Sequence, residues 1–147
     1  WVLDKALKLK VWMRKPKSHD VAFEDEVWAM FARVGFTRLS KDRNLRISYG
    51  KAPNERKQVD VLAADEEVVL VVECKSSDKE DAPTIPFKSE VESITGYRQG
   101  LIGTIREQFP NAKVKFLLAT NNINITKEAL ERIENADIAH LNEDAIA

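Results

Sequence analysis

Residues 58–75 read QVDVLAADEEVVLVVECK, and this stretch decides the fold. Its two apolar runs, 58–63 and 68–74, are rich in β-branched residues and predict two strands, of which the second is buried. The acidic triplet 65–67 between the runs predicts a turn. Because the connection is so short, we expect the two strands to be antiparallel neighbours.

The segments that follow predict a parallel crossover. Apolar side chains recur at helical spacing over 89–109, and Pro110 ends that helix. Residues 114–119 form another buried strand, so the intervening helix implies a right-handed connection between parallel strands. A last amphipathic helix capped by Thr126 and a short strand over 138–141 complete the chain.

Two further features belong to this half of the chain. Residues 76–88 contain two prolines, three acidic side chains and little apolar content, which predicts a mobile loop. Gly96, Gly100 and Gly103 recur on one side of the long helix, where each costs about 1 kcal/mol relative to alanine. We expect close packing on the sheet to offset that cost.

Two helices are predicted at the beginning of the chain. Residues 1–17 have apolar side chains at helical spacing with lysines between them. A clearer apolar stripe follows, with Asp20 or Ser18 as the N-cap residue and Gly35 at the C-terminal end.

Extended segments connect these helices to the central stretch. Residues 36–49 are basic, and a turn near 41–44 predicts a hairpin, whereas residues 50–57 predict a loop. The full order is α-α-β-β-β-α-β-α-β. It predicts an α/β sandwich in which helices flank a mixed sheet.

Composition excludes several classes of protein. The chain has 147 residues, of which 44% are hydrophobic and 32% charged, an ordinary balance for one globular domain. No apolar stretch approaches the ~20 residues of a membrane-spanning helix. One cysteine and two histidines exclude an internal disulfide and a four-ligand Cys/His zinc site. With Trp1 in first place and no signal-peptide pattern, we expect a domain cut from a longer chain in a reducing, cytoplasmic compartment.

The net charge of −1 is unevenly distributed. Residues 1–57 carry 14 Lys/Arg against 7 Asp/Glu, whereas residues 58–147 carry 9 against 17. The basic part predicts contact with a polyanion. The alternative is that the two parts attract each other within one domain.

The residues that predict chemistry lie on the two central strands. Asp60 and Glu73 are 13 positions apart, and Lys75 follows two positions after Glu73. Side chains alternate along a strand, so Glu73 and Lys75 share one face, and the turn brings Asp60 beside Glu73. Two carboxylates and a main-chain carbonyl suit Mg²⁺ or Mn²⁺, and a nearby lysine can stabilise charge on a phosphate. The set predicts phosphodiester hydrolysis, and the alternative is a structural Glu–Lys ion pair.

These residues resemble the PD-(D/E)xK nuclease superfamily, whose fold is restriction-endonuclease-like. The runs QVDVL and VVLVVECK match its motif strands, with Val59 in the place of the proline before the motif aspartate. The helix that contains FEDEV and ends in VGF is similar to the leading helix of Mrr-like restriction endonucleases. More loosely, the chain resembles nuclease-like segments of bacterial DNA-modification and phage-defence proteins, which implies a further domain in the parent protein. The resemblance implies an αβββαβ core within residues 20–147, preceded by a basic helical segment over 1–19.

The resemblance also implies roles for single residues. Asp60 and Glu73 hold Mg²⁺, with Mn²⁺ as a substitute, and Glu24 supports that site. Lys75 positions the attacking water, and Gln99 of the long helix lies near the scissile phosphate. The alternatives are a solvated helix face for Glu24 and a surface position for Gln99. The expected phosphate contacts are basic side chains that precede the central strands: Arg38, Lys41, Arg43, Arg46, Lys51, Arg56 and Lys57.

Three hypotheses about function follow. The first is a Mg²⁺-dependent DNA endonuclease, for which double-strand cleavage favours a dimer because one such site cuts one strand. The second is a module of the same fold that has lost catalysis and binds nucleic acid or a partner protein. The third is a structural or interaction domain in which Glu73 and Lys75 form ion pairs.

Overall fold

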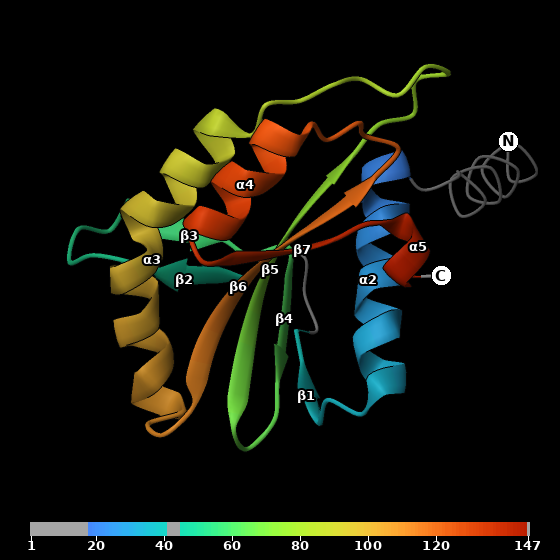
Figure 1. Ribbon diagram of the computed structural model, residues 1–147. Helices are drawn as coiled ribbons and strands as arrows, with labels where there is room; N and C mark the ends of the chain where they lie inside the picture. The colour runs from blue at the N-terminus through green and yellow to red at the C-terminus, as the bar shows by residue number, and fades with distance from the viewer. Residues whose placement is uncertain (1–17, 41–44, 147) are drawn as a thin grey trace, which may run out of the picture.

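Five strands form a central mixed sheet in the computed structural model, which describes residues 18–40 and 45–146 (Figure 1). In chain order they are β1 (Arg38–Leu39), β4 (Val61–Ala64), β5 (Val68–Ser76), β6 (Lys113–Asn121) and β7 (Ile138–Leu141). They also lie in this order in space: β1, β4 and β5 pair antiparallel, whereas β5, β6 and β7 pair parallel. The antiparallel neighbours and the parallel crossover predicted from the sequence are therefore confirmed. The helix predicted over residues 1–17 lies outside the described residues.

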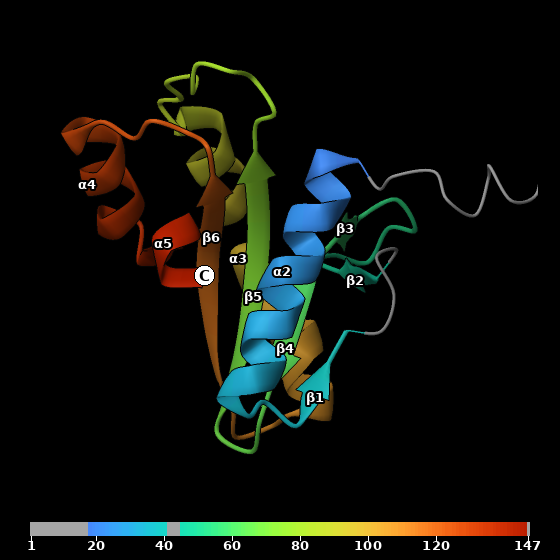
Figure 2. The same ribbon diagram turned by 90° about the vertical axis from the view of Figure 1, so that its right-hand side faces the viewer.

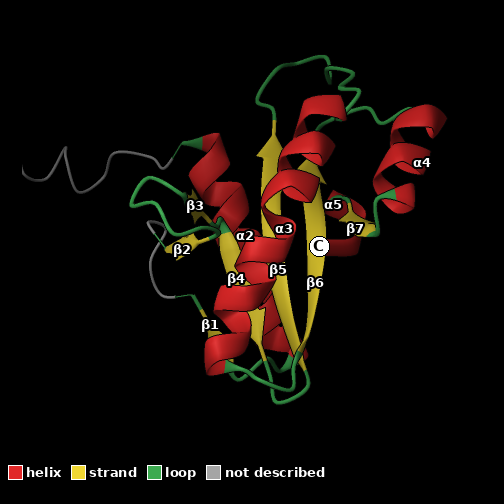
Figure 3. Cartoon of the chain, turned by 90° about the vertical axis from the view of Figure 1, so that its left-hand side faces the viewer, coloured by secondary structure: helices red, strands yellow, loops and turns green. Residues whose placement is uncertain are grey.

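Helices cover both faces of this sheet. One face carries α2 (His19–Val34) and α5 (Glu143–Ile146), and the other carries α3 (Lys88–Gln108) and α4 (Lys127–Asn135). Figure 2 shows α2 in front of the sheet, and Figure 3, from the opposite side, shows α3 in front. Phe23 and Val27 lie in the core under α2, and Ile94 and Leu101 in the core under α3. The predicted α/β sandwich is thus confirmed, and no helix in the described part is long and apolar enough to span a bilayer.

Local sequence explains where the helices begin and end. Ser18 caps α2 in preference to Asp20, because its hydroxyl accepts a hydrogen bond of 3.3 Å from a backbone amide of the first turn. Gly35 ends α2 with a φ of 109°, a left-handed conformation that glycine adopts without strain. Thr126 caps α4 through its side chain, as predicted.

The hairpin predicted over residues 36–49 is wrong. The remaining strands, β2 (Arg46–Ser48) and β3 (Arg56–Gln58), form a separate two-stranded sheet, called the small sheet below. The predicted loop over 50–57 is therefore partly a strand. β1 pairs with β4 at the edge of the central sheet, whereas β2 pairs with β3, so β1 and β2 are not partners. The expected αβββαβ order is present as α2-β1-β4-β5-α3-β6, with the small sheet inserted after β1.

The small sheet is fastened to α3. Gly100 lies so close to Tyr49, which follows β2, that a Cβ atom at this glycine would overlap the tyrosine carbonyl. Close packing therefore explains Gly100, although the contact is with the small sheet and not with the central one. Apart from its chain neighbours and the backbone of α3 itself, a Cβ atom at Gly96 or Gly103 would meet no described atom within 4 Å, and nothing in the described residues explains these two glycines.

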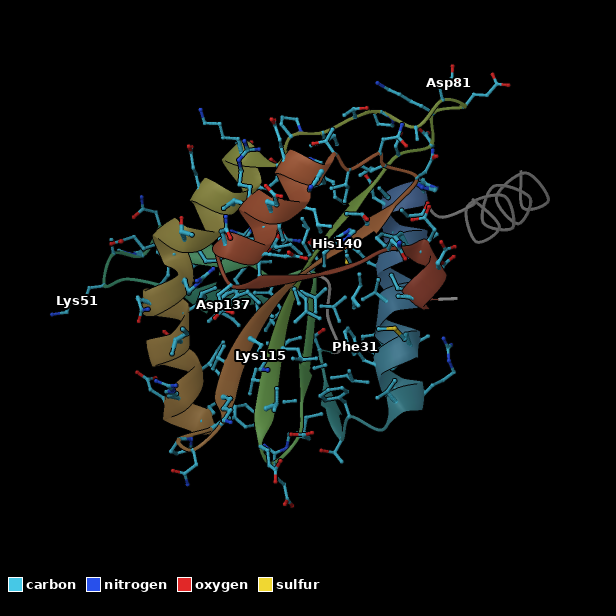
Figure 4. All side chains as sticks on the ribbon, in the orientation of Figure 1. Phe31, Lys51, Asp81, Lys115, Asp137 and His140 are labelled. Carbon is cyan, nitrogen blue, oxygen red and sulfur yellow. The ribbon has the colours of Figure 1, made fainter. Side chains whose placement is uncertain are left out.

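The segment between β5 and α3, predicted as a mobile loop, is tied to the loop that follows β6. Asn122 Nδ2 donates to the carbonyls of Ser77 at 2.9 Å and Lys79 at 2.8 Å. Asn124 Nδ2 likewise donates to the carbonyl of Ala82 at 2.9 Å. Asp81 lies at the tip of the loop (Figure 4). The loop is thus anchored on both sides of its tip, and it leads the chain into the first turn of α3.

Candidate functional site

The antiparallel pair of β4 and β5 brings the two predicted carboxylates together. Val61 lies opposite Val72, which places Asp60, just before β4, beside Glu73. Asp60 Oδ2 accepts a hydrogen bond of 2.8 Å from the backbone N–H of Cys74. The Asp60 carboxylate is thereby fixed against the strand that carries Glu73.

Glu73 and Lys75 face α3, as the alternation along β5 predicts. Both line a cavity of about 340 Å³ between β5 and α3, called the α3 hollow below. Polar side chains from α3 and one lysine from β3 share this lining: Lys57, Ser89, Glu90, Ser93 and Tyr97. Ile94 and Leu118 add apolar surface, so the end of β5 opens into a cavity with a mixed polar and apolar lining.

A second cavity of about 300 Å³ lies on the α2 side of the same strand end. This α2 hollow is lined by Asp20, Glu24, Asp60, Cys74, Lys75 and Ser76. Ser76 Oγ donates to Asp20 Oδ1 at 2.7 Å and fastens the first turn of α2 to β5. Glu24, one helical turn after Asp20, thus borders the same cavity as Asp60. Lys75 borders both hollows, so the strand end lies between them.

Glu73 has the most perturbed carboxyl group of this site. Burial, followed by the negative charge of Asp60, raises the pKa of Glu73 from its ordinary 4.5 to about 7. Lys57 Nζ lies 3.4 Å from Glu73 Oε1, and the Tyr97 hydroxyl donates to the same oxygen at 3.4 Å. Both partners oppose the rise in pKa but do not cancel it. The carboxylate pair therefore carries negative charge that the surrounding protein neutralises only in part.

Lys75 is held at the edge of the α3 hollow by Glu90. Its Nζ lies 3.5 Å from Glu90 Oε2, and 45% of the lysine side chain is exposed. An ion pair with this exposure contributes on the order of 0–1 kcal/mol. The ammonium group can therefore exchange Glu90 for another anionic oxygen at little cost.

Gln99 and Tyr97 of α3 lie in different surroundings. Gln99 is exposed and borders neither hollow, so it does not join the other candidate residues. It follows Tyr97 by two positions, about 200° around a helix, and the two side chains therefore point in nearly opposite directions. Tyr97, which sequence reasoning did not select, does line the site. It comes three positions after Ile94 in the apolar stripe of α3, a spacing that could have indicated it.

The predicted phosphate contacts are spread over the molecule. Three of them are exposed on the small sheet or its turn: Arg46, Lys51 and Arg56. Lys51 points away from the body of the protein (Figure 4), whereas Lys57 points into the α3 hollow. Arg38 lies over the Phe109 ring at 5.4 Å, at the opposite end of the central sheet. Lys41 and Arg43 lie outside the described residues.

The donor set is compatible with a hard divalent cation. Within residues 18–40 and 45–146, no three His, Cys, Asp or Glu side chains converge as a metal-binding group. Mg²⁺ commonly takes only one or two protein carboxylates and completes its shell with water and substrate oxygens. Asp60 and Glu73, adjacent and incompletely neutralised, supply that number of carboxylates.

Comparison with known proteins supports the fold alone. No family model and no curated protein matches the sequence. The crystal structure of AF1548, a protein of unknown function, has a TM-score of 0.59 and 14% identity, and the match covers 83% of this chain and 57% of that chain. This chain therefore spans a little over half the length of that protein.

Two further structures are more distant in fold. An XisH family protein from Nostoc punctiforme has a TM-score of 0.49 and 21% identity, covering 84% of this chain and 90% of that chain. An fdxN element excision controlling factor protein from Anabaena variabilis has a TM-score of 0.48 and 20% identity, covering 88% of this chain and 95% of that chain. Likeness at these levels carries no conclusion about activity, and no match supports the Mrr-like branch.

Proposed function

We propose that this chain is a metal-dependent nuclease domain that hydrolyses phosphodiester bonds in DNA. The observation that carries the proposal is the position of Asp60 beside Glu73, with Lys75 on the same strand at the edge of the α3 hollow. Two carboxylates that can hold a cation, together with a lysine near them, are suitable groups for attack of water on a phosphodiester.

Asp60 and Glu73 would hold the cation, Mg²⁺ or Mn²⁺ as its substitute. When bound, the cation supplies a more acidic water and neutralises charge on the phosphate. The raised pKa of Glu73 supports this assignment, because a desolvated carboxylate beside a second one gains much from a cation. Glu24 borders the α2 hollow together with Asp60 and would support the site from that side.

Lys75 would act on the reacting groups. Its exposed pairing with Glu90 leaves the ammonium group able to turn toward a water molecule or a phosphate oxygen. There it would orient the attacking water and stabilise the negative charge that develops on the phosphate.

The exposed cations of the small sheet would bind the DNA backbone. The small sheet and its turn carry three exposed cations, Arg46, Lys51 and Arg56. The same sheet carries Lys57, which lines the α3 hollow. Phosphates held along this sheet would therefore lie near the proposed site. Because one such site cuts one strand, cleavage of both strands would require two copies of the chain.

Cleavage of supercoiled plasmid by the purified chain in Mn²⁺ tests the proposal. We expect cutting that EDTA abolishes and that Asp60→Ala and Lys75→Ala each reduce by at least about a hundredfold. Lys115→Ala removes an exposed lysine of β6 and is the matched control, which should cut like the wild type. Full cutting by either site variant, with its circular dichroism spectrum unchanged, would contradict the assignment.

A second candidate is a nuclease-fold module that binds DNA without cutting it. The observation in its favour is the ion pair of Lys57 with Glu73, which already gives one carboxylate a positive partner. Such a module would bind a labelled duplex equally well in EDTA and in Mn²⁺, and Asp60→Ala would not alter that binding. Fluorescence anisotropy under both conditions separates it from the nuclease.

A further inference from the structure

We propose that Lys57 is a second phosphate-contacting lysine of this site, one that reaches the DNA only after a divalent cation has displaced it from Glu73. The inference rests on the proposed function and deepens it. Before the cation binds, Lys57 takes the cation's place beside Glu73. After the cation binds, Lys57 turns to the phosphodiester backbone of the substrate.

Lys57 extends from β3 into the α3 hollow. Its Nζ lies 3.4 Å from Glu73 Oε1, and the two side chains are only 31% and 19% exposed. The same ammonium group lies 5.6 Å from the centre of the Tyr97 ring, within cation–π distance. Arg56, the preceding residue on β3, is exposed. Lys57 is thus the cation of this strand that lies among the residues of the proposed site.

The backbone around Lys57 is fixed, so a change of partner is confined to its side chain. Ile47, the register partner of Lys57 on β2, is buried in the core under α3. The next carbonyl on β2, that of Ser48, accepts a hydrogen bond of 2.6 Å from Thr104 Oγ1 of α3. Gly100 of α3 lies against the backbone that follows. The flexible four-carbon stem of lysine then supplies all the movement that the exchange requires.

Charge decides which cation occupies Glu73. An ammonium group and a divalent ion at one carboxylate repel each other, so a divalent ion that binds Glu73 displaces Lys57. The displaced ammonium group has lost its anionic partner in a cavity that Lys75 also lines. A phosphate entering that cavity becomes the new partner. Lys57 therefore adds to DNA binding only when the site holds a divalent ion.

Isothermal titration calorimetry with Mn²⁺ measures the first half of this inference. Lys57→Met keeps an apolar stem beside Tyr97 and removes the charge, and it should bind Mn²⁺ about three- to fivefold more tightly than the wild type, the factor expected for a half-buried ion pair. Lys57→Arg keeps a cation and should bind Mn²⁺ with nearly the wild-type affinity. Arg56→Met removes the same charge from the exposed side of β3 and is the matched control, expected to stay within about twofold of the wild type.

Fluorescence anisotropy of a labelled duplex measures the second half. Binding is read in EDTA and in Ca²⁺, which takes the same kind of oxygen ligands as Mg²⁺. Lys57→Met should bind like the wild type in EDTA. In Ca²⁺ it should bind more weakly, with a salt dependence reduced by about one phosphate contact. Arg56→Met should weaken binding equally in both solutions.

The outcomes separate this inference from the proposed function. If the wild type binds Mn²⁺ and Lys57→Met binds it no more tightly, or loses DNA affinity equally in EDTA and Ca²⁺, the inference is overturned and the nuclease proposal stands. If the wild type binds no Mn²⁺, both fail. Lys57→Gln takes the place of Lys57→Met if the circular dichroism spectrum shows that the methionine variant does not fold.

Discussion

Glu73 stands at the end of a buried strand, where an ionised carboxylate is costly unless a positive charge accompanies it. Lys57 supplies such a charge, whereas Asp60 adds repulsion. Because the pKa of Glu73 is raised to about 7, a proton, a lysine and a divalent ion compete for this carboxylate near neutral pH. The affinity for Mn²⁺ should therefore increase as the pH rises through this range.

Replacing Glu73 by Gln should remove a pH dependence from the free energy of unfolding. The pKa of Glu73 rises from 4.5 in the unfolded chain to about 7 in the folded one, so the protonated side chain stabilises the fold fully below pH 4.5 and this contribution is lost as the pH rises to about 7. Measured in EDTA, the free energy of unfolding of the wild type should decrease from pH 4.5 to about pH 7. This decrease should exceed that of Glu73→Gln by on the order of 3 kcal/mol. Urea denaturation at several pH values measures this difference. Glu107→Gln, on the exposed face of α3, is the control, and curves for the wild type and Glu73→Gln that stay parallel would refute the assignment.

For single residues, the alternation of side chains along a strand determines which positions the sequence can predict. The positions of Asp60, Glu73 and Lys75 follow from strand alternation and one short turn, and the structure brings them to one strand end. The position of Lys57 depends on how the small sheet packs against α3. No spacing of charged residues encodes that long-range contact, so Lys57 was predicted only as one of several phosphate contacts.

Among the elements, α3 connects the central sheet, the small sheet and the proposed site. Tyr97 of α3 donates a hydrogen bond to Glu73, and Glu90 of α3 forms an ion pair with Lys75. Gly100, one turn after Tyr97, holds the small sheet at close range. A side chain at this glycine would therefore disturb the strand pair that carries Lys57 into the site.

Two glycine-to-alanine exchanges in α3 should change the free energy of unfolding in opposite directions. Gly100→Ala should lower the free energy of unfolding by about 1–3 kcal/mol, because its Cβ atom would overlap the backbone of Tyr49. Gly103→Ala makes the same exchange where the new atom meets no described atom within 4 Å outside its own stretch of α3, and it should raise the free energy of unfolding by about 0.5–1 kcal/mol. Urea denaturation at neutral pH measures both variants. Stabilisation by both exchanges would show that α3 and the small sheet are not in close contact.

The elements that the sequence predicted well have long apolar patterns. β5, β6 and α3 were expected within one or two residues of their bounds, because each buries many apolar side chains. The two- and three-residue strands β1 and β2 carry little pattern, and their observed partners are β4 and β3. Strands this short are paired through the packing of the assembled core and not through a local sequence pattern.

For the whole molecule, both interpretations of the uneven charge have a structural counterpart. The ion pair of Lys57 with Glu73 is an attraction between the basic first part and the acidic second part of the chain. Arg46, Lys51 and Arg56 of the same basic part remain exposed, which leaves them available to a polyanion. The small sheet thus contributes one ion pair between the two parts and also carries exposed cations.

Cation binding should stabilise the whole molecule, because Asp60 and Glu73 come together only when β4 and β5 pair. Mn²⁺ at about 100 times its Kd should add about 2.7 kcal/mol to the free energy of unfolding, which for a chain of this size raises the Tm by roughly 5–10 °C. Thermal unfolding followed by circular dichroism measures the rise, and EDTA should reverse it. Glu73→Gln removes one ligand and should abolish most of the rise, whereas Glu107→Gln should keep it. An equal rise in Glu73→Gln would place the cation elsewhere, and no rise in the wild type would favour the module that binds DNA without a metal.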